Sequence, residues 1–163
     1  MTTEIYSIFP ACGKTWLYEH QKDYGLKILD SDSSQFSWVY VNGVKERNPD
    51  FPANYIQHIK ENIGKYDYIF VSTHASVRDA LEIEGIDFTI VVPAHRNKAE
   101  WVGRCYIREM KGENGCSAAA MYDNWDQWGA DCFMSAKHHA FIVLRPGEYL
   151  SNYLKEGDKH ERL

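Results

Sequence analysis

The chain has 163 residues, of which 44% are hydrophobic and 25% charged, values typical of one globular domain with a single core. Its net charge of −5 and pI near 5.8 disfavour a general nucleic-acid-binding protein but are compatible with a local basic cleft. No apolar run approaches the roughly 18 residues of a membrane span, and the N-terminus lacks a secretory pattern. Four cysteines lie far apart without metal-ligand spacing, so we expect a reduced, cytoplasmic protein with no zinc site and no membrane partner.

Apolar segments with strand and helix periodicity alternate along the chain. In chain order, the pattern predicts a strand at 5–9, a helix at 14–21, a strand at 26–29, a helix at 53–63, a strand at 68–71, a helix at 77–83 capped by Ser76, a strand at 88–92, helices at 94–110 and 118–135, a strand at 140–144 and a last helix at 148–155. Residues 30–52 are rich in turn formers and are predicted to be a loop, and the charged tail 156–163 is expected to fray.

This alternation predicts a single α/β domain over residues 1–163, with a mainly parallel sheet covered by helices on both faces. Right-handed crossovers place the carboxyl ends of all parallel strands at one edge of the sheet, where ligands bind. We therefore expect the functional residues to follow the predicted strands directly.

The segment Gly13-Lys14-Thr15 joins the first predicted strand to the first predicted helix, as in a phosphate-binding (Walker A) loop. In such a loop, backbone N–H groups and a helix N-terminus bind phosphate oxygens, and a lysine adds a full positive charge. The Thr15 hydroxyl would bind Mg²⁺. The predicted nucleotide-binding residues are Ala11, Cys12, Gly13, Lys14, Thr15 and Trp16.

The loop departs from the pattern G-x-x-x-x-G-K-[ST] at its first position, where the chain has Ile8 instead of glycine. A β-branched residue does not readily adopt a positive φ or allow close approach of the backbone to a phosphate. The alternative interpretation is an ordinary strand–turn–helix corner.

Asp30 and Asp32 follow the second predicted strand, at the edge that faces the loop. A carboxylate there can accept the proton of an acceptor hydroxyl or hold a metal-bound water. We predict both residues to be catalytic, with Asp30 joining Thr15 at Mg²⁺ and Asp32 contacting the acceptor. The alternative is that they form an Asx turn and a helix cap.

Residues 95–111 carry three arginines and two lysines in a chain that is acidic overall. Arginine binds phosphate oxygens through two parallel donors, and a lid excludes water that would compete as acceptor. We predict a helical lid at about 95–115, with Arg96 and Arg104 as catalytic phosphate contacts. The alternative is a solvated helix face with Glu100 and Glu109 as ion-pair partners.

Arg47, in the predicted loop, is the only arginine between the second and third predicted strands, and we predict that it binds an acceptor phosphate, with Lys45 as the other candidate. Phe36 and Tyr55 are predicted to stack on a base of the acceptor. The alternatives are an exposed arginine and aromatic residues of the core.

The chain resembles small bacteriophage-type members of the P-loop nucleoside and nucleotide kinase superfamily. Four segments carry the resemblance: Phe9-Pro10-Ala11-Cys12-Gly13-Lys14-Thr15, Asp30-Ser31-Asp32-Ser33-Ser34-Gln35-Phe36-Ser37, Asn48-Pro49-Asp50-Phe51-Pro52-Ala53-Asn54-Tyr55 and Gly147-Glu148-Tyr149-Leu150-Ser151. The Asp-x-Asp segment is also similar to that of shikimate-type kinases, whose carboxylates serve Mg²⁺ and the acceptor. Relatives often have glycine where this chain has Ile8 and Ala11.

The resemblance implies a three-layer P-loop fold with a five-stranded parallel sheet in the order 2-3-1-4-5 and an arginine-bearing lid after the fourth strand. It also implies ATP and Mg²⁺ as ligands and, for a phage protein, the host cytoplasm as location. Many such enzymes end the third strand with a metal-ordering aspartate. This chain has Ser72-Thr73-His74 there, so Asp30 or Asp32 takes that role or the site is impaired.

Three functions follow as hypotheses. The first is transfer of the γ-phosphoryl group of ATP to a (deoxy)nucleoside monophosphate or similar small acceptor. The second is a kinase acting on modified bases or ends in DNA, which the acidic pI disfavours. The third is a nucleotide-binding module without catalysis, which the departures at Ile8, Ala11 and the third strand favour.

Overall fold

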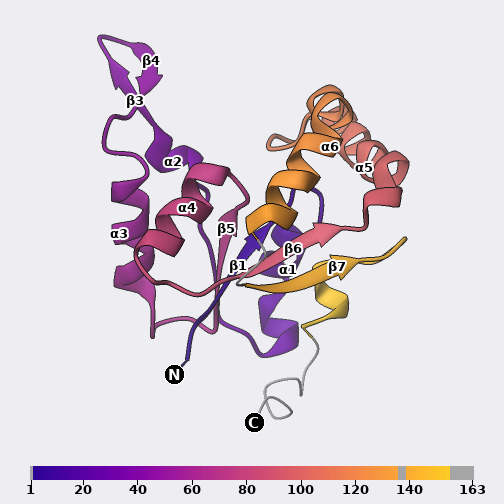
Figure 1. Ribbon diagram of the computed structural model, residues 1–163, viewed down its shortest axis with the longest axis horizontal. Coiled ribbons are helices and arrows are strands. Elements are labelled where there is room, and N and C mark those ends of the chain that lie inside the picture. Colours follow the sequence, from indigo (N-terminus) through magenta and orange to yellow (C-terminus); the bar gives the residue numbers. More distant parts are fainter. Residues whose placement is uncertain (1, 136–138, 155–163) are drawn as a thin grey trace.

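The computed structural model describes residues 2–135 and 139–154 and contains a five-stranded sheet in which every neighbouring pair of strands is parallel (Figure 1). Its strands, in spatial order, are β2 (Ile28–Asp30), β5 (Tyr68–Ser72), β1 (Glu4–Ile8), β6 (Thr89–Pro93) and β7 (Ala140–Leu144). The predicted α/β class with a parallel sheet is confirmed.

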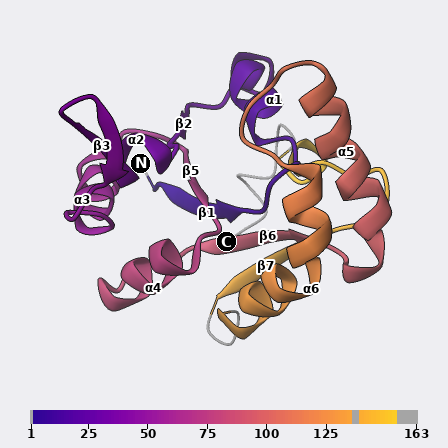
Figure 2. The same cartoon turned by 90° about the horizontal axis from the view of Figure 1, so that it is seen from above.

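The core is centred on β1, β5 and β6, whose consecutive apolar residues are buried on both faces of the sheet. Tyr6 lies at its middle, fully buried, with Phe70 on one neighbouring strand and Thr89 on the other as its register partners. Figure 2 shows α1 (Lys14–Glu19) and α4 (Ala75–Ile83) on opposite sides of the sheet. The carboxyl ends of the strands therefore meet at one covered edge.

The remaining helices are α3 (Ala53–Asn62), α5 (Lys98–Met110) and α6 (Ala118–Ser135), all close to their predicted bounds. Three short 3₁₀ segments replace the ends of predicted helices: Gln21–Tyr24, His95–Asn97 and Leu150–Asn152. The predicted last helix at 148–155 is thus wrong over its described part, and its end and the tail 156–163 lie outside the described residues. Ser76 is not a cap, because α4 begins at Ala75, after His74.

The predicted loop at 30–52 is wrong in its central part, which contains the short helix α2 (Ser34–Ser37) and an antiparallel hairpin of β3 (Trp38–Val41) and β4 (Val44–Arg47). Asn42 and Gly43 form its turn, both with positive φ, 51° and 77°. Asn-Gly between short β-prone segments is a strong hairpin signal because this turn requires positive φ at both positions. The hairpin projects from the body of the molecule (Figure 1).

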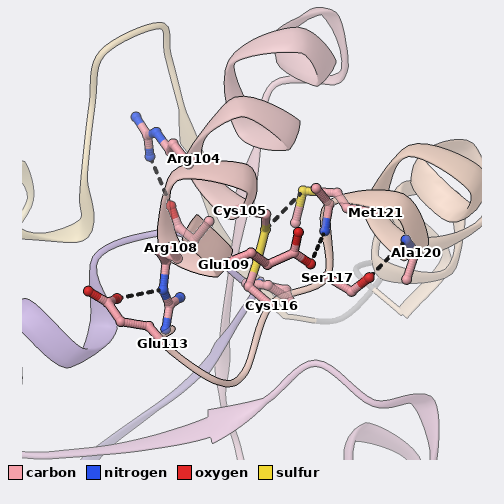
Figure 3. Close-up of a disulfide and its surroundings, with 12 residues drawn as sticks. Arg104, Cys105, Arg108, Glu109, Glu113, Cys116, Ser117, Ala120 and Met121 are labelled. Atoms are coloured by element: carbon pink, nitrogen blue, oxygen red, sulfur yellow. Dashed lines mark hydrogen bonds and ion pairs between the residues drawn. A yellow bond between two sulfur atoms is a disulfide. The ribbon is translucent and has the colours of Figure 1, made fainter. Parts of the chain in front are cut away.

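A disulfide joins Cys105 of α5 to Cys116, in the segment that precedes α6, which differs from the expectation that all four cysteines are reduced (Figure 3). Glu109 Oε1 accepts a 2.9 Å hydrogen bond from the first backbone N–H of α6, at Ala118. Arg108 pairs with Glu113 at 3.3 Å. Among the described helices, none combines the length and hydropathy needed to cross a membrane.

Candidate functional site

The loop after β1 carries a run of unpaired backbone donors. Within the described part of the chain, the N–H groups of residues 11–16 donate to no backbone or side-chain acceptor. Buried or half-buried N–H groups are nearly always paired in folded proteins, and consecutive free N–H groups in a turn form a concavity that binds anions. Helix α1 has only six residues, so most of the positive field must come from these N–H groups and from Lys14.

The two departures from the loop pattern have different structural consequences. Ile8 lies within β1, buried and paired with Ser72 and Val91, so no positive φ is needed there. Ala11 does adopt a left-handed conformation, with φ at 63°, and Gly13 follows with φ at 86°. The loop therefore does not need glycine at position 8. The unfavourable positive φ is at Ala11 instead, where the Cβ makes this conformation cost free energy.

Arg104 of helix α5 fixes the loop after β1 through hydrogen bonds. Its Nη1 donates to the carbonyl oxygen of Ala11 at 3.0 Å, and its Nη2 donates to the carbonyl oxygen of Glu148 at 2.8 Å. The Glu100 carboxylate lies 3.3 Å from Nη2. The guanidinium also stacks on Trp101 and Tyr149, 3.7 and 4.0 Å from the ring centroids. We interpret Arg104 as a positioning residue of the loop. It pairs with Glu100, as the alternative of a solvated helix face expected, but its side chain is largely buried instead of solvated.

The segment after β7 completes this support. The backbone N–H of Leu150 donates to the carbonyl oxygen of Cys12 at 2.9 Å. A Cβ at Gly13 would lie 3.0 Å from Cδ1 of Tyr149, so glycine is required there both for its φ and for this close contact. Burial raises the pKa of Cys12 to about 12, which keeps this loop thiol protonated.

Lys14 and Asp30 meet across the site. Lys14 Nζ lies 2.7 Å from Asp30 Oδ1, so the loop and the carboxyl end of β2 are joined by an ion pair. The side chains of Thr15 and Trp16, which follow Lys14, are exposed, and Trp16 stacks on His20 with ring centroids 4.1 Å apart. The structure thus brings together Lys14 and Asp30, two of the predicted site residues.

Asp32 and Tyr55 take the local roles that the alternatives described. Asp32 Oδ1 accepts from the backbone N–H of Ser34 at 2.9 Å, which is an Asx turn at the start of α2. The Tyr55 ring is fully buried, and its hydroxyl donates to the carbonyl oxygen of Ser31 at 2.7 Å. Burial raises the pKa of Tyr55, so this donor stays protonated and fixes the Asp30-Ser31-Asp32 segment.

The other predicted substrate contacts lie around this segment. Half-buried Phe36 packs against Tyr55 and His58, with ring centroids 5.2 and 4.8 Å apart. Arg47 ends β4, with its guanidinium 4.1 Å from the Trp38 ring centroid. Arg96 is exposed at the edge beyond β6, and no hydrogen bond or ion pair engages its side chain within the described residues.

The prediction missed Arg78, a buried arginine near the loop. It lies on α4 between Val77 and Leu81, the two other buried residues of that helix. A charged residue on the apolar face of a short helix was a signal in the sequence. Desolvation, with the positive charges of Arg47 and Arg78, lowers the pKa of nearby His74.

The residues present fit a magnesium nucleotide. Residues 2–135 and 139–154 contain no cluster of three or more His, Cys, Asp or Glu side chains arranged to hold a metal. Mg²⁺ in nucleotide sites is bound mainly by phosphate oxygens and water with one or two protein ligands. Thr15 and Asp30 would supply those ligands, and the unpaired N–H groups would bind the phosphates.

In comparisons with known proteins, the chain matches no protein-family model and no curated protein. Any inference about function therefore depends on the geometry of this site.

Proposed function

We propose that this protein is a P-loop phosphotransferase that moves the γ-phosphoryl group of ATP to a (deoxy)nucleoside monophosphate or similar small acceptor. The observation that carries the proposal is the row of unpaired N–H groups at residues 11–16 beside Lys14. Counted along the chain within the parallel sheet alone, the order β2-β5-β1-β6-β7 reads 2-3-1-4-5, as the resemblance to nucleotide kinases implies.

In this proposal the loop binds the phosphates of ATP, and Lys14 leaves Asp30 to contact the β- and γ-phosphates. The acceptor hydroxyl oxygen forms a bond to the γ-phosphorus while the bond from that phosphorus to the β–γ bridging oxygen breaks, and ADP leaves. The hydroxyl proton passes to the carboxylate of Asp30 or Asp32. Thr15 would hold Mg²⁺, which supplies charge neutralisation when bound.

The cations at the edge have distinct proposed roles. Arg96 is exposed and has no partner among the described residues, which leaves its guanidinium free for the proposed contact with the transferred group. Arg104 acts through the loop, because its donors are engaged by carbonyl oxygens. Arg47, stacked on Trp38, would border the acceptor.

Isothermal titration tests this function with ATP, a non-hydrolysable ATP analogue and each deoxynucleoside monophosphate, with and without Mg²⁺. We expect a triphosphate and one monophosphate to bind, and Lys14→Ala to weaken the triphosphate by about 10-fold or more while abolishing transfer. Lys22→Ala is the matched control, because Lys22 is exposed on the 3₁₀ segment after α1. Absence of triphosphate binding at millimolar concentration would exclude the proposal.

A second candidate is a nucleotide-binding module without catalysis. It is favoured by β5, which runs into Ser72-Thr73-His74 without a carboxylate. Measured turnover on any acceptor removes this candidate, whereas triphosphate binding without turnover on any acceptor supports it.

A further inference from the structure

A cavity of about 250 Å³ lies beside the start of the phosphate loop, between the N-terminal end of α4 and helix α6. Its lining includes Pro10, Thr73, His74, Arg78, Asp131 and Cys132. It therefore adjoins the loop after β1 and the carboxyl end of β5. This volume would hold several water molecules of about 30 Å³ each, which is enough for a phosphate group and part of the molecule that carries it.

Arg78 is the unusual residue of this cavity, because its charge is buried without a counter-charge. The residue is 2% exposed. Its Nε donates to Ser135 Oγ at 3.0 Å, its Nη1 donates to the carbonyl oxygen of Thr73, and its Nη1 lies 3.7 Å from Cys132 Sγ. All three partners are neutral.

No carboxylate of the described residues lies within 4.0 Å of the Arg78 guanidinium. Within the same ranges its Nη2 has no hydrogen-bond partner. Burying an unpaired charge costs several kcal/mol, and buried charges are therefore usually paired or bind a ligand. The three neutral acceptors hold the guanidinium in one orientation, with one edge left for an anion.

Two further polar side chains line the same cavity. His74 lies at the N-terminal end of α4, and desolvation together with the positive charges of Arg47 and Arg78 lowers its pKa. Asp131 lines the opposite wall, where its Oδ1 accepts a 2.8 Å hydrogen bond from Gln127. A guanidinium and a carboxylate in one cavity select a ligand that has both an anionic group and a hydroxyl donor.

We propose that the Arg78 cavity binds the phosphate monoester of a hydroxylated acceptor, with Arg78 holding the phosphate and Asp131 accepting from a hydroxyl group. A nucleoside monophosphate or a sugar phosphate has this chemistry. The term acceptor rests on the proposed phosphotransferase function, whereas the anion site itself does not. The acceptor phosphate thus lies at α4.

The experiment measures binding in the Lys14→Ala background, which disables the phosphate loop. Inorganic phosphate, nucleoside 5′-monophosphates, a pentose 5-phosphate and the matching nucleosides are titrated calorimetrically. We expect the phosphate esters to bind and the nucleosides to bind at least 10-fold more weakly. Arg78→Gln should lower phosphate-ester affinity by about 10-fold or more, and Arg78→Lys should restore part of it.

Asp131→Asn keeps the proposal testable if Arg78→Gln fails to fold. Removing this carboxylate should strengthen binding of inorganic phosphate several-fold, because a repelling charge leaves the cavity, and should weaken discrimination for hydroxylated esters. The Nε–H resonance of Arg78, assigned by its loss in Arg78→Lys, should shift on addition of phosphate. Phosphate-ester binding that is unchanged in folded Arg78→Gln, or weaker inorganic phosphate binding in Asp131→Asn, would overturn the inference.

Titration of ATP into the wild-type protein, added to these measurements, separates this inference from the proposed function. Arg78-dependent binding of phosphate esters without any triphosphate binding keeps the anion site and rejects the phosphotransferase. Triphosphate binding, together with monophosphate affinity that is unchanged in Arg78→Gln, rejects the anion site and keeps the phosphotransferase.

Discussion

The Arg104 guanidinium and the Ala11 carbonyl, 93 positions apart in the chain, are joined by a 3.0 Å hydrogen bond that fixes the loop after β1 to helix α5. The same guanidinium donates to the carbonyl oxygen of Glu148 and lies between the rings of Trp101 and Tyr149. The first strand, the lid segment and the segment after β7 therefore converge on one side chain. Loop geometry and the position of α5 are coupled through it.

Arg104→Gln is expected to lower the free energy of unfolding by about 1–3 kcal/mol, because two partly buried carbonyl oxygens lose a charged donor. Arg96→Gln is the matched control, since Arg96 is exposed and makes no hydrogen bond or ion pair within the described residues. It should leave stability within about 0.5 kcal/mol of the wild type and lower turnover instead. Urea unfolding and kinetic assays distinguish the two. Equal stability losses would contradict the different roles assigned here.

Ala11→Gly is expected to stabilise the protein by about 0.5–1 kcal/mol, because glycine adopts the left-handed φ of 63° without the steric cost of a Cβ. The same substitution at Ala99, an exposed position within α5, should destabilise by about 1 kcal/mol. Thermal unfolding of the two variants should therefore give shifts of opposite sign. A loss of stability in Ala11→Gly would mean that the loop does not hold this backbone conformation.

The free energy of unfolding should depend on the protonation of His74. Desolvation and the charges of Arg47 and Arg78 lower the pKa of His74, although Asp32 acts in the opposite direction. The folded state thus binds a proton less readily than the unfolded chain. The stability that the neutral ring contributes is fully present above pH about 6.5 and is lost as the pH falls through the lowered pKa.

Urea unfolding at pH 7.5, 6.5 and 5.5 checks this dependence, and His74→Gln is the comparison. The wild type should lose more stability between pH 7.5 and 5.5 than the variant does. The difference between the two proteins removes the contribution of the other histidines, such as the exposed His95 paired with Asp126. A larger acid loss in the variant would show that the pKa of His74 is raised instead.

The Cys105–Cys116 disulfide should stabilise the folded state by about 2–3 kcal/mol, because it closes a loop with a sequence separation of 11 in the unfolded chain. Reduction should lower the stability of the wild type and leave Cys116→Ser unchanged. Alkylation after denaturation without reductant should label Cys12 and Cys132 only, and reductant should add the other two cysteines. Four labelled cysteines in both samples would show that the bond does not form.

The parallel sheet and the candidate site at its edge can be predicted from local sequence patterns. Buried strands appear as continuous apolar runs, and Gly13-Lys14-Thr15 stands between a strand and a helix, so Lys14 and Asp30 could be placed at the same edge. The importance of Ile8 was judged from the motif alone. Its pairing within β1 shows that the motif's first glycine position belongs to the strand in this chain.

The features that the sequence did not reveal depend on contacts between distant residues. Arg104 is one of several cations in its helix, and only the packing of the segment after β7 turns it toward the loop. Arg78 is separated by 54 positions from Cys132 and by 57 from Ser135, the two side chains of α6 that its guanidinium contacts. The hairpin could have been predicted, because Asn42-Gly43 is a direct turn signal and Trp38–Val41 before it consists of aromatic and β-branched residues.

The hairpin of β3 and β4 is separate from the five-stranded sheet, so its sequence can change without affecting the sheet. Strands β3 and β4 pair only with each other, and Tyr40 is 73% exposed at the far end from the sheet. Most substitutions in the hairpin should therefore cost the five-stranded sheet little stability. Arg47 lies at the base of the hairpin, where β4 ends. If Arg47 borders the acceptor as proposed, substitutions in the hairpin would change which acceptor binds without changing the sheet or the loop after β1.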